Sequence, residues 1–162
     1  MTTRRPLLTA LAAALAVPLG VAGCASGSTD AEITRALESA IVAAVPHSTG
    51  VFVGLGYSGA SNRTVVVNLY LDSDDTSIVS AAVDSGLKTV WAAIAVEPVS
   101  VGISATAGQK PHDAERYEPN ALDPRPVASA LGIDPKHVIH HLIDLDAATL
   151  VARYGAWQAP AS

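Results

Sequence analysis

The sequence predicts an α+β fold: a two-layer sandwich in which helices cover one face of an antiparallel sheet of three or four strands. Two observations lead to this class. Apolar residues recur at helical spacing in two segments, and they alternate with polar residues in three others. Strands with one apolar and one polar face need a single covering layer of helices. The order helix, strand, strand, helix, strand forms a core over residues 31–107, and residues 108–162 form a loop and a C-terminal extension that we expect to pack on the same domain.

The first helix is expected to begin at a capping box, because Thr29 is followed three residues later by Glu32. Ile33, Leu37 and Ile41 then form a helical stripe, which ends before Pro46.

Two strands follow, over residues 51–57 and 65–71, with alternating apolar residues. The turn of five residues over positions 58–62 predicts an antiparallel hairpin. Asp75 lies in a turn, and aspartate is a residue type that caps the start of helices. A second helix is therefore expected over residues 78–94. Pro98 precedes a third strand, in which Val99, Val101, Ile103 and Ala105 share one face.

The C-terminal part is less regular. Residues 108–123 lack an apolar period and predict an exposed loop. A short helix is expected from Pro124 to Leu131, and a last helix over residues 147–154. Residues 134–144 fit a short helix by the spacing of their apolar residues and a buried strand by their β-branched residues. The pair Val138 and Ile139 favours a fourth strand, with residues 137–143 extended.

Composition excludes several classes of protein. With 49% hydrophobic residues the chain is not disordered, and a net charge of −5 gives no attraction to nucleic acid. Gly54, Gly56 and Gly59 match a dinucleotide-binding fingerprint, but a strand rather than a helix follows them. We therefore expect no cofactor and no nucleic-acid partner. Arginine is preferred to lysine, which is typical of high-GC genomes.

The N-terminus has the pattern of an export signal. Arg4 and Arg5 precede an apolar run of 15 residues over positions 7–21. A membrane-spanning helix needs roughly 20 such residues, so this run fits a cleaved signal peptide. It ends in Val21-Ala22-Gly23-Cys24, and the segment resembles a bacterial lipoprotein signal peptide with its lipobox.

This resemblance implies that a diacylglyceryl group is attached to the Cys24 thiol and that cleavage falls between Gly23 and Cys24. Residues 1–23 are then the signal peptide and residues 24–30 a lipidated tether. The expected localisation is the outer face of the bacterial cytoplasmic membrane, which the protein contacts through acyl chains on Cys24. Two or three acyl chains anchor a protein stably.

The histidines near the C-terminus are the other candidates for chemistry. On a helix, His137, His141 and Asp144 share one face and have the spacing of zinc ligands. On a strand, residues four positions apart lie about 13 Å from each other. Because we favour the strand, no metal site is favoured.

We therefore expect a non-catalytic binding or structural module of the cell envelope, with an envelope protein or a small ligand as its partner. Two alternatives remain open. One is a metal-dependent or hydrolytic enzyme that uses the C-terminal His/Asp cluster. The other is a carrier of an apolar ligand such as a lipid.

Overall fold

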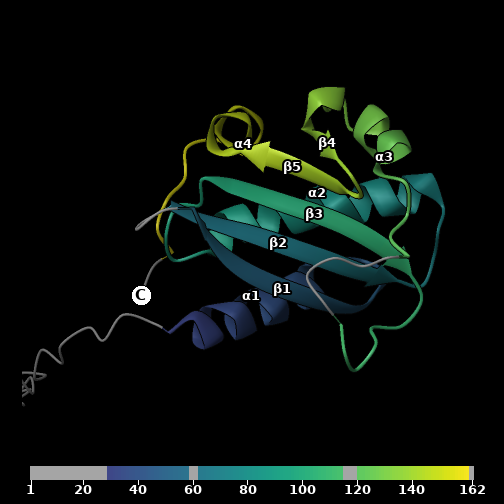
Figure 1. The fold of residues 1–162 in the computed structure, drawn as a ribbon, viewed down its shortest axis with the longest axis horizontal. Coiled ribbons are helices and arrows are strands. Elements are labelled where there is room, and N and C mark those ends of the chain that lie inside the picture. The colour runs from purple at the N-terminus through teal and green to yellow at the C-terminus, as the bar shows by residue number, and fades with distance from the viewer. Residues whose placement is uncertain (1–28, 59–61, 115–119, 161–162) are drawn as a thin grey trace, which may run out of the picture.

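The computed structural model describes residues 29–58, 62–114 and 120–160, which form a two-layer α+β fold (Figure 1). The elements, in chain order, are α1 (Asp30–Ala44), β1 (Ser48–Ser58), β2 (Asn62–Leu71), α2 (Thr76–Ala93), β3 (Ser100–Ala107), α3 (Pro124–Ala130), the 3-10 turn η1 (Pro135–His137), β4 (Val138–Ile139), β5 (Leu142–Asp146) and α4 (Ala147–Tyr154). The predicted fold class is confirmed, as are the helices and strands predicted before residue 134.

α1 begins at the predicted capping box. The hydroxyl of Thr29 accepts a hydrogen bond from the backbone N–H of Glu32, and the Glu32 carboxylate accepts one from the N–H of Thr29 at 2.8 Å. Ile33, Leu37 and Ile41 are buried and place α1 against β1. The helix ends at Ala44, and Val45 after it has an extended backbone. Val45 precedes Pro46, and helical backbone angles are disfavoured for a residue that precedes a proline.

The sheet has five strands in the order β1-β2-β3-β5-β4. β1 and β2 form the predicted antiparallel hairpin, and β5 is antiparallel to both β3 and β4. β2 and β3, however, run parallel. The sequence predicted a purely antiparallel sheet of three or four strands. Both parts of this prediction are wrong, because one pair of strands is parallel and the sheet has five strands.

The parallel pair is a consequence of α2. A helix of 18 residues is about 27 Å long at 1.5 Å per residue, similar to the length of the strands. It returns the chain to the end of the sheet where β2 begins, so β3 runs in the same direction as β2. Asp75 starts this crossover helix, because its carboxylate accepts a hydrogen bond from the N–H of Ser77 at 2.8 Å.

The segment 134–144, whose sequence fits either a helix or a strand, leads into a short hairpin over residues 138–146. Ile139 pairs with Leu142, so the two residues between them, His140 and His141, make the turn. The strand interpretation is correct for Val138–Ile139 and from Leu142 onward. It is wrong for His137, which ends a 3-10 turn, and for the two histidines of the turn.

The helices of the described residues lie on one face of the sheet. α1 and α2 pack on β1, β2 and β3, whereas α3 and α4 contact α2 and β5. In Figure 1, α2 is seen behind the sheet. The core lies between these layers, and four residues predicted to be buried are buried there: Val67 and Leu69 on β2, and Val83 and Leu87 on α2.

Polar contacts fix α4 on α2. The Arg153 guanidinium donates to Asp84 Oδ1 from Nε at 3.0 Å and from Nη2 at 2.8 Å, and the Tyr154 hydroxyl donates to the same oxygen at 2.9 Å. Burial raises the pKa of Tyr154, so its hydroxyl keeps its proton and remains a donor. The indole N–H of Trp91 donates to the carbonyl oxygen of Gly155 at 3.0 Å, just beyond the end of α4.

The other face of the sheet carries no helix among the described residues, and we call it the open face. Its residues on the two central strands are Thr64, Val66, Asn68 and Tyr70 of β2 and Ser100, Gly102, Ser104 and Thr106 of β3. Part of it is nevertheless buried, because Asn68 and Tyr70 are at most 1% exposed. There the Ser104 hydroxyl donates to Asn68 Oδ1 at 2.6 Å.

Candidate functional site

A groove of about 210 Å³ lies on the open face, beside the β4–β5 hairpin. Its lining comes from four neighbouring strands and from the hairpin turn. These residues are Thr64, Val65, Val66, Ser100, Gly102, Ile139, His140, Leu142 and Asp144.

Gly102 forms the floor of this groove. The strand register places it between Val66 on β2 and Asp144 on β5. A Cβ atom added at Gly102 would lie 3.8 Å from atoms of Val66, Leu142 and Asp144, which is ordinary van der Waals contact. The missing side chain therefore leaves a hollow that a larger residue would fill without a clash of its Cβ.

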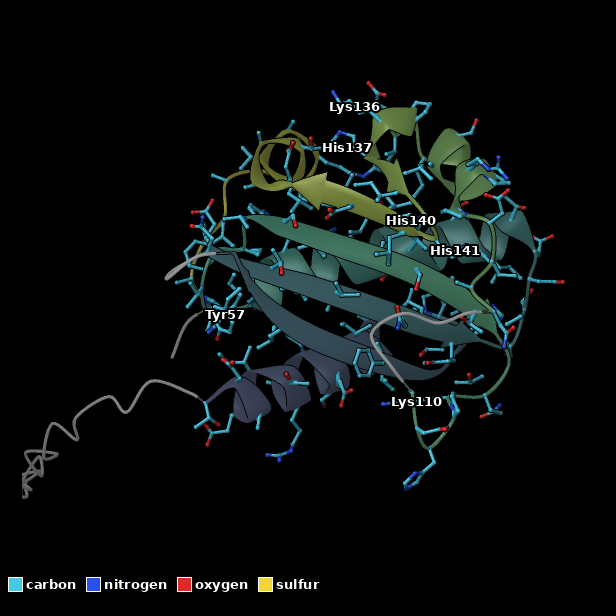
Figure 2. All side chains as sticks on the ribbon, viewed as in Figure 1. Tyr57, Lys110, Lys136, His137, His140 and His141 are labelled. Carbon is cyan, nitrogen blue, oxygen red and sulfur yellow. The ribbon has the colours of Figure 1, made fainter. Side chains whose placement is uncertain are left out.

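The hairpin forms one wall. Ile139 is 47% exposed, although it is a large apolar residue. His140 follows it with a positive φ of 53°, a conformation that is uncommon for residues with a side chain. Two-residue hairpin turns require such angles, which explains the strain at His140. Figure 2 shows His140 and His141 at the tip of the hairpin.

The groove has an apolar lining and a polar rim. Val66, Ile139 and Leu142 supply apolar contacts, and the rim adds the hydroxyl groups of Thr64 and Ser100, the Asp144 carboxylate and the His140 imidazole. A mainly apolar lining with a few polar groups is typical of sites that take small ligands.

The structure does not gather the side chains of His137, His141 and Asp144 as metal ligands, although His137 lies against the backbone of Asp144. His137 Nδ1 donates to the backbone oxygen of Asp144 at 3.1 Å, and its Nε2 lies 3.4 Å from the Thr149 hydroxyl. His141 lies at the exposed turn (Figure 2). The Asp144 side chain, in contrast, lines the groove. The helical arrangement of His137, His141 and Asp144 is therefore absent, because the segment is a hairpin.

Neighbouring carboxylates are engaged as helix caps. The backbone N–H of Thr149 donates to Asp146 at 2.7 Å and holds the pKa of Asp146 below its usual value. The N–H of Lys136 does the same for the pKa of Asp134. Over residues 29–58, 62–114 and 120–160, no three His, Cys, Asp or Glu side chains are grouped as metal ligands.

No family model, no curated protein and no solved structure matches this chain. In the part of the chain that the structure describes, no helix has the length and hydrophobicity to cross a membrane.

Two of the predicted site residues, Gly23 and Cys24, lie outside the described residues. Sequence reasoning also missed the groove itself. One signal was available in the sequence. Gly102 is a glycine among residues with larger side chains on the polar face of its strand. A glycine inside a strand often marks a place where a ligand or another backbone segment approaches closely. The position of Ile139 over that glycine depends on the hairpin turn, which the alternation of residues did not reveal.

We expect that zinc does not bind stoichiometrically. The domain would be loaded with zinc, freed of excess metal, and measured for zinc content and melting temperature beside a His141→Ala control. Both proteins should retain no zinc and melt at unchanged temperatures, because the three candidate ligands do not converge. One retained equivalent with a raised melting temperature would contradict this expectation, since a metal that binds only the folded state must stabilise it.

Proposed function

We propose that the protein is a bacterial lipoprotein, anchored to the outer face of the cytoplasmic membrane through Cys24, and that it acts there as a non-catalytic binding module. The anchor is supported by the lipobox at residues 21–24 and by its position, since the described domain begins at Thr29. The observation that carries the binding role is the groove on the open face of the sheet.

The size and lining of the groove favour one class of ligand. At about 210 Å³ it is smaller than the sites of about 300–1,000 Å³ that take drug-sized molecules. It fits an aromatic or branched apolar side chain with a polar group at its edge, such as the anchor residue of an envelope protein. The Asp144 carboxylate and the two rim hydroxyls would then accept or donate hydrogen bonds at that edge.

A carrier that holds a lipid inside the core is less well supported. Between α2, α3 and β3, on the core side of the sheet, a pocket lined by Val79, Val83 and Ile103 measures about 10 Å³. This is the space of about one water molecule. The apolar layer between helices and sheet is therefore too closely packed at this point to accept an acyl chain.

Filling the groove should abolish binding. Gly102→Val adds an isopropyl group to the floor, and valine suits a strand. We expect p-cresol, which mimics a tyrosine side chain, to shift the amide resonances of Ile139, His140 and Leu142 in the parent domain. These shifts should be lost in Gly102→Val, because the added side chain occupies the same space.

A control is Ala81→Val, which introduces the same valine side chain on the exposed side of α2 and should keep the shifts. Gly102→Val should melt near the parent temperature, because its new Cβ meets its neighbours at 3.8 Å. Identical p-cresol shifts in parent and Gly102→Val, or shifts spread over other surfaces, would contradict the proposed groove.

A further inference from the structure

One end of the sheet is tied to the first turn of α1. The Tyr57 hydroxyl, at the end of β1, donates to the Asp30 carboxylate at 2.6 and 2.7 Å. Arg63, which pairs with Tyr57 across the hairpin, donates from Nη2 to Asp30 at 3.2 Å and to the Tyr57 oxygen at 3.0 Å. The start of the helix is thereby fixed beside this end of the sheet. Figure 2 shows Tyr57 there and Lys110 at the opposite end.

Exposed apolar side chains gather at the same end. Val99 lies beside Arg63, because its N–H donates to the Arg63 carbonyl oxygen at 2.8 Å. Val96 precedes it in the connection from α2 to β3. Tyr57, Val96 and Val99 are 53%, 46% and 37% exposed, and they are half of the six large exposed apolar residues among those described. We call these three residues the anchor-side surface.

Charge at this end comes from one ion pair and from further carboxylates. Asp30 is neutralised by Arg63, whose side chain is largely buried, and its carboxylate is also occupied by the Tyr57 hydroxyl. Exposed carboxylates at this end also come from Glu97 between the two valines, from Glu32 in the first turn of α1, and from Asp146, which pairs with Ser100 next to Val99. The chain after Cys24 as a whole carries 15 acidic against 8 basic side chains. The anchor-side surface would therefore contact lipid through its three apolar side chains and not through attraction to anionic headgroups.

The length of the tether limits where this end can lie. Asp30 follows Cys24 by six positions in the chain, and a chain of that length spans about 20 Å at most. Acyl chains on Cys24 would therefore hold the first turn of α1, and with it Tyr57, within that distance of the membrane. Tyrosine is enriched at membrane interfaces, where its ring is apolar and its hydroxyl is hydrated.

We propose that the anchor-side surface rests on the lipid bilayer and fixes the orientation of the domain on the membrane. This inference depends on the proposed lipid anchor at Cys24. The partner is a phospholipid surface, which Tyr57, Val96 and Val99 contact at the depth of the headgroups. The hairpin tip with His140 and His141 then points away from the membrane.

Single-cysteine labelling tests this orientation on the lipidated protein. Cys24 is the only cysteine of the chain, and its sulfur is blocked when lipidated, so an introduced cysteine is the one reactive thiol. Val96→Cys and Val99→Cys place a fluorophore on the anchor-side surface. Val42→Cys and Val151→Cys are matched controls, because these valines are 48% and 40% exposed on α1 and α4.

Each labelled protein is reconstituted into vesicles of phosphatidylethanolamine and phosphatidylglycerol that contain headgroup-quencher lipids. We expect labels at positions 96 and 99 to lose fluorescence and labels at 42 and 151 to keep it. Equal quenching at all four positions, in protein that floats with the vesicles, would overturn the orientation and leave the anchor intact. Protein without acyl chains on Cys24, which fails to float, would overturn both.

Discussion

Replacing Val67 with aspartate is expected to destabilise the domain by more than about 3 kcal/mol. Val67 is fully buried at the centre of β2, between Val53 on β1 and Ile103 on β3. A carboxylate there would be out of contact with solvent, so it must either be buried as a charge or take up a proton. Urea unfolding, followed by circular dichroism on the non-acylated Cys24→Ser domain, measures the change in the free energy of unfolding.

Val96→Asp is the matched control for this substitution, because Val96 is 46% exposed in a connection between α2 and β3. The same chemical change there should alter stability by no more than about 0.5 kcal/mol. A Val67→Asp domain as stable as its parent would mean that the side chains of β2 point to the opposite faces of the sheet.

Cys24→Ser is expected to abolish lipid attachment completely. Thioether formation needs a thiol, and the chain contains no second cysteine that could replace this one. Bacteria expressing the parent should incorporate labelled palmitate into the protein. The variant should carry no label and should remain uncleaved or be released as a soluble species.

Ser28→Ala provides a control for this experiment, because it changes the tether and leaves the lipobox intact. It should be labelled as strongly as the parent. Palmitate incorporation into Cys24→Ser would refute the proposed lipoprotein, and with it the proposed localisation.

The core of this fold could be predicted because its periodic signals are long. Val65, Val67, Leu69 and Leu71 alternate without interruption, and the helix that follows keeps its stripe for five turns. The direction of β3 was not predicted, although the order of strand, helix and strand contained the information. A connecting helix as long as the strands brings the chain back to its starting edge, and this topological argument goes beyond the period of any one element.

The candidate site was harder to predict because it depends on a short hairpin. β4 has two residues, too few for alternation to distinguish a strand from a helix, and its turn uses a histidine at positive φ instead of asparagine or glycine. Only the pairing of β5 with β3 places Asp144 beside Gly102. Residues distant in sequence create the groove, and no local pattern indicates that they meet.

The strand order also determines how the chain loses conformational entropy when it folds. Three residues separate β1 from β2, whereas residues 108–141 separate β3 from β5. If these segments are treated as flexible loops, closing the longer one costs about 2 kcal/mol more than closing the shorter one. The pairing of β5 with β3 therefore adds little stability until β3 has joined the sheet. The contacts of α4 with Asp84 and Trp91 on α2 then help to offset the entropy lost by the C-terminal third of the chain.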